Sequence, residues 1–365
     1  GRLAICDLRG TLYLTDKNGE SAQLYLDHRK YDIAFDASMM PNETGLGGFA
    51  FHPEFSKEDR PGYGKFYTAF SAISGSGEAD YLKDDARSHE SVIVEWTTTD
   101  PNAVPFHGTY REVFRIGQFA PNHSVGTLAF KPTAKPKTPD YGILYFCLGD
   151  GGAAFDPKDY GQSLQSPHAA ILRINPMPAK GAAYQIPKDN PFVSRSNVTP
   201  EIWAYGLRHP QHFSWDETGR MFIVDIGQNQ VEEVNVGLPG ANYGWRLREG
   251  TFSTGAGVEG ATVGPVYDIP ADDSQTFTDP VAQYDHDEGR AIGSGFAYQG
   301  TKIKALMGKY VFADIVRGRI FYIDTKNLEP GNPAEIQELR LVIDGKEQDF
   351  IDVAGYPNTY REGPR

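Results

Sequence analysis

The chain repeats one short pattern: an apolar strand, a turn, a second apolar strand and a loop rich in Gly and Asp. The pattern is clearest in residues 201–250 and returns in residues 43–72, 124–175 and 293–325. Recurrence at roughly fifty residues is typical of propeller blades, and about six blades would use this length. We therefore predict an all-β fold, a six-bladed β-propeller forming a single domain over residues 1–365. A β-sandwich is the alternative, but it would not repeat its loop chemistry.

The composition fits short strands separated by turns and excludes some functions. The 365 residues include 40 Gly, 25 Pro, 20 Tyr and 21 Phe, and no apolar run reaches membrane-spanning length. A net charge of −13 argues against nucleic-acid binding, because nothing would offset phosphate repulsion. Cys6 and Cys147 are too few for a disulfide framework and lack metal-ligand spacing. We expect buried free thiols, with a single long-range disulfide as the alternative.

Several motifs resemble, in order, those of the glucose/sorbosone dehydrogenase family. They are ETGLGGFAFHPEF (43–55), NHSVGTLAFKP (122–132), LYFCLGDGG (144–152), YGLRHPQ (205–211), DIGQNQVEEVN (225–235), NYGW (242–245) and GSGFAYQG (293–300). The family includes soluble sugar dehydrogenases that use pyrroloquinoline quinone (PQQ) and calcium. It also includes relatives such as hedgehog-interacting protein, whose propeller serves binding. Family members are usually exported, so the resemblance implies a periplasmic or secreted protein.

The resemblance implies a catalytic His–Asp couple. His123 matches the His that takes the proton from the anomeric hydroxyl of the sugar, a role that suits imidazole because it titrates near neutral pH. Asp150 matches the acid that orients this His and stabilises the imidazolium. Without the resemblance, His123 would be a loop His bonded to a carbonyl, and the Gly-Asp-Gly-Gly sequence would be only a turn.

Three residues match positions that contact PQQ in the family, and a fourth candidate, Arg317, lies beside such a position. Arg208 would stabilise the negative charge that develops on a quinone oxygen as it accepts hydride; the alternative is a buried Arg–carboxylate pair. His209 stands where the family usually has Asn, and Glu43 where the glucose enzymes carry Gln. Arg317 lies beside Val316, which occupies the position of a family Lys.

Calcium has two candidate places, both implied by the resemblance. The main-chain carbonyls of Gly227 and Gln228 match the loop that holds the calcium of PQQ, where the ion would act as a Lewis acid. Glu233 and the carbonyl of Tyr243 match a structural calcium site of some relatives, with the hard oxygen ligands that calcium prefers. The alternative for Glu233 is a solvated surface side chain.

Two functions follow from the resemblance. The first is a PQQ- and calcium-dependent dehydrogenase that oxidises an aldose to a lactone and passes electrons to an external acceptor. We expect His123, Asp150, Arg208 and Gly227 to converge at one mouth of the propeller. The second is a cofactor-free, calcium-stabilised propeller that serves as a binding module or carries unassigned chemistry. It is favoured by Asp349 and Ile351, which stand where the family has two arginines, unless Arg361, Arg365 or residues beyond the given chain supply that charge.

Three further stretches have simpler interpretations. Residues 251–280 form a long insertion without periodicity, which we expect near the site, where it could shape substrate access. The acidic run at 285–289 (DHDEG) lacks the ligand spacing of a calcium loop and indicates a solvated turn. The chain starts at Gly1 without Met, so we expect that an N-terminal segment has been removed or left out. Family members commonly continue past the position of Arg365 with two strands that complete the last blade, so either the ring closes differently here or residues beyond the given chain complete it.

Overall fold

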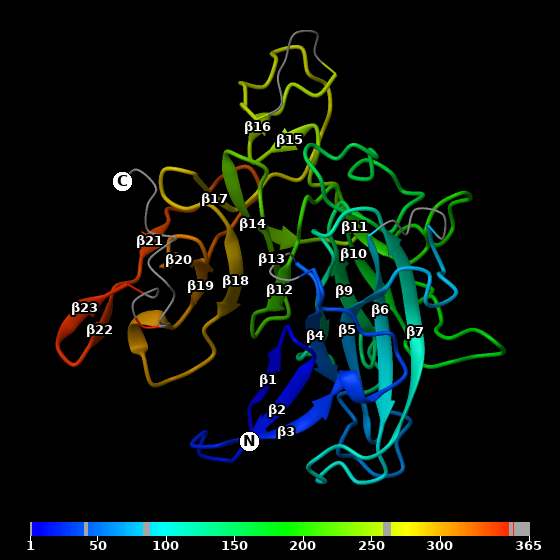
Figure 1. The fold of residues 1–365 in the computed structure, drawn as a ribbon. Coiled ribbons are helices and arrows are strands. Elements are labelled where there is room, and N and C mark those ends of the chain that lie inside the picture. The colour runs from blue at the N-terminus through cyan, green and yellow to red at the C-terminus, as the bar shows by residue number, and fades with distance from the viewer. Residues whose placement is uncertain (1, 40–42, 83–87, 258–263, 350–352, 354–365) are drawn as a thin grey trace. The chain divides into compact units, whose positions relative to one another are not determined.

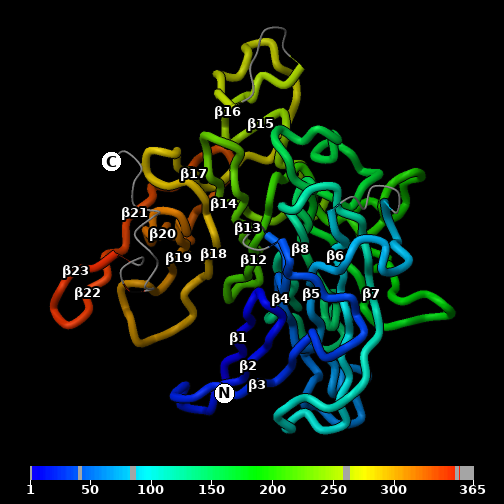
Figure 2. Tube along the Cα trace, in the orientation of Figure 1, coloured from blue at the N-terminus to red at the C-terminus, as the bar shows by residue number. Residues whose placement is uncertain are grey.

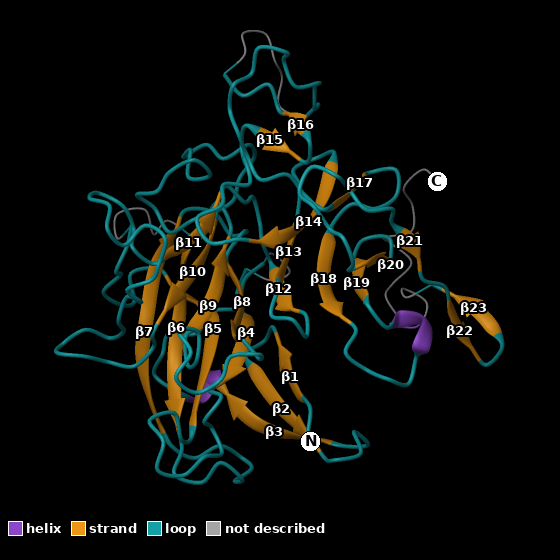
Figure 3. Ribbon diagram, turned by 180° about the vertical axis from the view of Figure 1, so that it is seen from behind, coloured by secondary structure: helices purple, strands orange, loops and turns teal. Residues whose placement is uncertain are grey.

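The structure is a computed structural model that describes residues 2–39, 43–82, 88–257, 264–349 and 353. Strands and loops make up nearly all of it, with short 3-10 turns at η1 (His28–Lys30) and η3 (Lys304–Leu306) (Figure 3). None of the helical segments in these ranges is long and apolar enough to cross a membrane.

The chain divides into two compact units. The first comprises residues 1–153 and 164–203, and the second residues 154–163 and 204–365. Each unit is described by itself below. The predicted single domain and the predicted convergence of His123, Asp150, Arg208 and Gly227 therefore stay predictions.

The first unit contains three sheets built from consecutive strands (Figure 1). They are β1 (Ala4–Asp7), β2 (Thr11–Thr15) and β3 (Ala22–Asp27); β4 (Leu46–Phe51), β5 (Lys65–Ile73), β6 (His89–Thr97) and β7 (Thr109–Gln118); and β8 (Val125–Phe130), β9 (Leu144–Leu148), β10 (Ala170–Ile174) and β11 (Ile202–Tyr205). The last two residues of β11 belong to the second unit.

The second unit contains two four-stranded sheets and two short hairpins (Figure 2). The sheets are β12 (His212–Trp215), β13 (Met221–Asp225), β14 (Val231–Gly237) and β17 (Ala282–Asp285); and β18 (Ile292–Ala297), β19 (Lys309–Asp314), β20 (Arg319–Asp324) and β21 (Gln337–Glu338). The hairpins are β15 (Arg248–Glu249) with β16 (Phe252–Ser253), and β22 (Leu341–Ile343) with β23 (Lys346–Gln348).

The described residues thus form five blade-like sheets in which neighbouring strands pair antiparallel, as β1–β2, β5–β6, β8–β9, β13–β14 and β19–β20 do. Each repeat that the sequence indicates contains at least two consecutive strands of one sheet, such as β4 and β5 in residues 43–72 and β8, β9 and β10 in residues 124–175. The all-β prediction is therefore confirmed. In the insertion at 251–280, Ser253 pairs with Tyr267, while residues 258–263 lie outside the described ranges.

Aromatic side chains fill the space between neighbouring sheets of one unit. In the first unit, Phe66 and Trp96 stack within a buried cluster, and the Trp96 indole donates a hydrogen bond to the Thr68 hydroxyl at 2.8 Å. In the second, the Phe222 and Tyr310 rings stack with centroids 4.4 Å apart. Burial of such large apolar faces is the main favourable contribution to folding, which explains the aromatic content of the chain.

The two cysteines are free thiols. Cys147 is buried in β9, and Cys6 is partly buried in β1. The structure therefore agrees with free thiols and not with the alternative of a long-range disulfide.

A carboxylate at the end of the second strand fixes the loop that enters the first strand of the same sheet. In β13, Asp225 accepts the backbone N–H groups of Arg208 and His209 at 2.8 and 2.7 Å. In β19, Asp314 accepts those of Arg290 and Ala291 at 2.5 and 2.7 Å. These loops have no strand partner for their N–H groups, so each buried carboxylate and its loop satisfy one another.

We expect Asp314→Ala to destabilise the fold by about 3 kcal/mol or more, since each buried donor left unpaired costs roughly 1–3 kcal/mol. Besides the amides of Arg290 and Ala291, the Asp314 carboxylate accepts the N–H groups of Val316 and Arg317 and the Tyr284 hydroxyl. Denaturant unfolding measures the change.

Asp324→Ala is the matched control. Asp324 also ends a strand of this sheet, but its half-exposed side chain makes an ion pair with Lys309 at 2.8 Å. Its loss should cost less than about 1 kcal/mol. Equal effects of the two substitutions would contradict the role of Asp314.

Candidate functional site

His123 is held by its backbone as well as by its ring. It precedes β8, is 3% exposed and has a φ of 54°, a left-handed conformation that is unfavourable for a side chain of this size. Its N–H donates to the Glu43 carboxylate at 2.6 Å. Glu43 was predicted to contact the cofactor; in the structure it contacts the backbone of His123.

The predicted His–Asp couple is present in the first unit. His123 Nδ1 lies 2.5 Å from Asp150 Oδ1, and Asp150 is fully buried. The same oxygen accepts the N–H of Gly152 at 3.0 Å. Gly151 and Gly152 have φ values of 84° and 93°, and a Cβ on Gly152 would lie 2.1 Å from Asn122 Oδ1, so this turn requires glycine.

This geometry equips His123 for proton transfer. An ionised carboxylate only accepts hydrogen bonds, so the His123 Nδ1 that faces it carries the hydrogen, which leaves Nε2 as the basic nitrogen. The buried carboxylate also stabilises the imidazolium that forms when Nε2 takes a proton. Asp150 lies just after β9, much as Asp225 lies at the end of β13. Asp225 accepts two loop amides, whereas Asp150 accepts one amide and the imidazole ring of His123.

The loop after β13 is fixed from inside by a carboxylate in the second unit. Glu249 Oε1 accepts four consecutive backbone N–H groups at 2.8–3.1 Å, those of residues 228–231. Gly227 is required at the start of this loop, because a Cβ there would lie 1.8 Å from the Val231 carbonyl oxygen. The N–H groups of residues 228–231 therefore all have the Glu249 carboxylate as their hydrogen-bond acceptor.

Arg208 fixes the same loop from its carbonyl side. Its Nη1 donates to the carbonyls of Ile226 and Gly227 at 3.0 and 2.7 Å, and its Nε to Gln228 Oε1 at 3.3 Å. The guanidinium lies over the Trp245 ring, 5.7 Å from its centroid. The alternative of an Arg–carboxylate ion pair is therefore wrong for this side chain, which bonds to carbonyl and amide oxygens.

As the loop stands, its donor set does not fit calcium at Gly227. A calcium ion binds carbonyl oxygens at about 2.4 Å, whereas Arg208 Nη1 already lies 2.7 Å from the Gly227 oxygen. The two cations would be within roughly 5 Å of one another on one carbonyl, where like charges repel. The prediction that Gly227 and Gln228 bind the ion is therefore not supported by this loop.

The second predicted calcium position contains a buried acid pair. Glu233 is not a solvated surface residue: it is 7% exposed, faces Asp225 across β13 and β14, and accepts the Gly250 N–H at 2.5 Å. Burial raises the pKa of Glu233 to about 7, and burial followed by the Glu233 charge raises the pKa of Asp225. The Tyr243 hydroxyl donates to the Val236 carbonyl at 2.7 Å. The metal role of Glu233 and Tyr243 stays a prediction.

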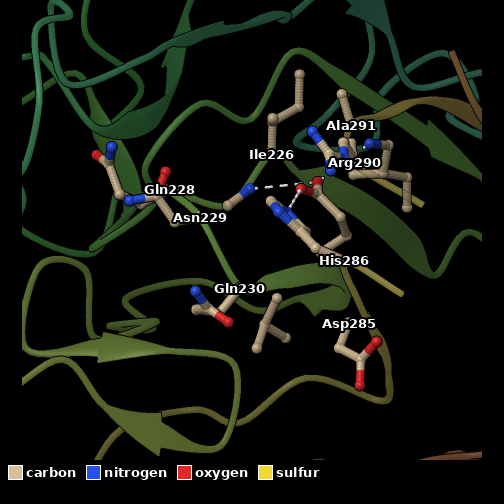
Figure 4. A network of polar contacts seen from close by, with 12 residues as sticks. Ile226, Gln228, Asn229, Gln230, Asp285, His286, Arg290 and Ala291 are labelled. Carbon is tan, nitrogen blue, oxygen red and sulfur yellow. Dashed lines mark hydrogen bonds and ion pairs between the residues drawn. The ribbon is translucent and has the colours of Figure 1, made fainter. Parts of the chain in front are cut away.

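A second His–carboxylate contact escaped the sequence reasoning. His286 Nε2 lies 2.9 Å from Oε1 of the fully buried Glu232, whose Oε2 accepts the N–H groups of Ile292 and Gly227 (Figure 4). The turn predicted at 285–289 is present, and its residues Asp285, Asp287 and Glu288 are exposed, whereas His286 is partly buried against Glu232. The apolar neighbours of Glu232 in the DIGQNQVEEVN motif were the available signal.

Two other predicted cofactor residues also have structural contacts. Arg317 donates its Nη2 to the His286 carbonyl at 2.9 Å. His209 is 2% exposed, and its N–H is held by Asp225. Their cofactor roles stay predictions. Asp349 lies at the edge of the described residues, whereas Ile351, Arg361 and Arg365 lie outside them.

The pH dependence of stability tests the acid pair. Because the folded-state pKa of Glu233 is raised, its stabilising effect is present below about pH 4.5 and is lost as pH rises through about 7. Glu233→Gln, which mimics the protonated acid, should flatten this fall, while Glu217→Gln on an exposed turn should leave it unchanged. Thermal unfolding from pH 4 to 8 measures both. Calcium on Glu233 would keep it ionised, so a stability that rises over this range would contradict the acid pair.

Comparison with solved structures identifies the fold. The PQQ-bound form of an aldose sugar dehydrogenase from Streptomyces coelicolor superposes with a TM-score of 0.61 at 24% identity, covering 93% of this chain and 78% of that chain. The apo-form of the soluble aldose sugar dehydrogenase from Escherichia coli gives a TM-score of 0.60 at 18% identity, covering 92% and 81%. The chain is thus an all-β propeller, as predicted, and five of its blades fall within the described residues.

Comparison with known sequences identifies relatives of two kinds. The HIPL1 protein of Arabidopsis thaliana is 29% identical over 335 residues, which cover 78% of this chain and 44% of that protein. Quinoprotein glucose dehydrogenase B of Acinetobacter calcoaceticus is 26% identical over 255 residues, which cover 65% and 46%. The chain thus spans less than half the length of these two relatives. The model of the Glucose / Sorbosone dehydrogenase family matches residues 1–347, and the chain therefore belongs to this family.

Proposed function

We propose that the chain oxidises the anomeric hydroxyl of an aldose to a lactone, with His123 as the general base. The observation that carries the proposal is the couple between His123 and the buried Asp150, 2.5 Å apart. A buried carboxylate that fixes the tautomer of a strained loop His is costly to keep for structure alone. Such a couple suits a reaction that removes a proton from a hydroxyl group.

The reaction separates one proton and one hydride. His123 Nε2 takes the proton of the C1 hydroxyl, and the electrons of the O–H bond form the new carbonyl as hydride leaves C1. PQQ, when bound, supplies the quinone that accepts this hydride. Within the second unit, Arg208 is the residue that suits this anionic cofactor, because its Nη2 has no hydrogen-bond partner among the described residues.

The proposal includes the partners that this chemistry requires. The substrate is a small sugar, and an external acceptor must remove the electrons after each turnover. We also propose a periplasmic or secreted location, supported by the family resemblance. Calcium has no step here, because the loop at Gly227 does not fit the ion.

A second candidate function is a cofactor-free propeller that serves as a binding module. The specific observation in its favour is that Nη1 of Arg208 donates both of its hydrogens to loop carbonyls. Val316 and Asp349, where the family has basic residues, leave fewer cations for an anionic cofactor. Dye reduction with PQQ distinguishes the two functions.

Replacement of His123 tests the base. The protein, incubated with PQQ and offered a panel of aldoses with an artificial dye, should reduce the dye, and His123→Ala should lower turnover by about 10²–10⁴-fold. Binding of PQQ, measured from its absorbance, should be unchanged. His107→Ala, at an exposed position of the same unit, is the control and should keep full turnover. If the unmodified protein reduces no dye with any aldose, the dehydrogenase proposal is wrong and the binding module takes its place.

Replacement of Glu43 tests whether it positions His123 or contacts the cofactor. Loss of a hydrogen bond to a charged acceptor costs roughly 1.5–3 kcal/mol, so Glu43→Ala should lower kcat by about 10–100-fold and shift the pH profile that reports His123. Glu43→Gln retains an acceptor oxygen and should recover most of the turnover.

A cofactor contact predicts a different pattern. In that case Glu43→Ala would change the Kd of PQQ and leave the pH profile in place. That result would restore the role that the sequence implied for Glu43.

A further inference from the structure

The loop at residues 226–231 is in contact with a cationic side chain, Arg208. The N–H groups of the loop from Gly227 onward are bonded to carboxylates, four of them to Glu249 and that of Gly227 to Glu232, while the Ile226 N–H donates to the His209 carbonyl. The carbonyls of Ile226 and Gly227 face the opposite charge, the guanidinium of Arg208. Figure 4 shows Ile226, Gln228, Asn229 and Gln230 of this loop in one view with His286.

We infer that Arg208 stands where a divalent cation would otherwise bind, so that this loop holds its conformation without a metal ion. Three oxygen atoms converge on the guanidinium: two carbonyls and Gln228 Oε1, at 2.7–3.3 Å. Carbonyl and amide oxygens are hard ligands, the type that calcium takes in proteins. Here each of them is already bonded to a fixed positive charge.

The position of Arg208 is over-determined, which distinguishes it from a surface arginine. Its own N–H is held by Asp225 at 2.8 Å, its guanidinium lies over Trp245, and the residue is 9% exposed. Gln228, which the Nε contacts, is itself fixed because its Oε1 accepts the Phe155 N–H at 3.0 Å. A side chain anchored at both ends keeps its charge at one place, as a bound ion does.

The inference does not depend on the proposed function, because it concerns the loop with neither PQQ nor sugar present. It has a direct consequence. Removal of the guanidinium leaves three converging oxygens without their cation, and a hard divalent ion is the species that suits them. Arg208→Met should therefore lower Tm and create a response to calcium beyond any that the unmodified protein shows.

Thermal unfolding with EDTA, calcium chloride or magnesium chloride tests this. At calcium concentrations about tenfold above the millimolar Kd of weak oxygen sites, the Tm of Arg208→Met should rise by about 3 °C more than that of the unmodified protein. Magnesium should do less, because it requires tighter octahedral geometry. Should Arg208→Met fail to fold, Arg208→Gln keeps a donor but removes the charge, and the same gain is expected.

Arg220→Met is the matched control. Arg220 also supports a turn and a carbonyl of this unit, through Asp216 and Thr325, but does not contact the loop at 226–228. Its loss should lower Tm without any gain in calcium response. If neither Arg208 variant gains a response, or if the unmodified protein responds and the Arg208 variants lose that response, the inference is wrong.

Discussion

The buried carboxylate at a strand end is the interaction on which the candidate site depends. A loop that enters a sheet brings N–H groups without strand partners, and a carboxylate removed from water needs donors. Asp225 and Asp314 solve both problems by accepting two loop amides each. Asp150 follows its strand in the same way but bonds to the ring of His123. Asp150 thus makes with a histidine ring the kind of contact that Asp225 and Asp314 make with loop amides.

The sequence predicted the elements whose determinants lie close together. Apolar runs bounded by turns mark the strands, and the two glycines at positive φ mark the turn after Asp150, whereas only the family resemblance indicates a role for Asp150 itself. The contacts that hold the site were not predictable in this way. Glu43 reaches a backbone amide 80 residues later, and Glu249 gathers four amides about 20 residues earlier. A backbone partner leaves no signature in residue type or spacing.

The role of Arg208 could be predicted only in part for the same reason. The family motif identifies the residue. Its partners, however, are the carbonyls of Ile226 and Gly227, and which group faces a carbonyl depends on how the loop turns. That turn is set by Glu249 on the amide side and by the absence of a side chain on Gly227. Only the folded loop reveals that the expected metal position holds a guanidinium.

The contacts in the second unit form a series that begins at the acid pair in the sheet and ends at the loop carbonyls. Asp225 and Glu233 are cross-strand neighbours in β13 and β14 whose burial favours a retained proton. Asp225 holds the main chain of Arg208, and Arg208 holds the loop carbonyls. A change in the charge of the pair therefore acts on the loop through Arg208 and through His209, whose N–H is held by Asp225 and whose carbonyl accepts the Ile226 N–H. The couple of His123 and Asp150 has no member in this series, since Glu43, His123 and Asp150 all belong to the first unit. Substitutions of Asp225 or Glu233 should consequently affect the order of the loop at 226–231, whereas substitutions of Glu43 or Asp150 should affect the basicity of the His123 imidazole.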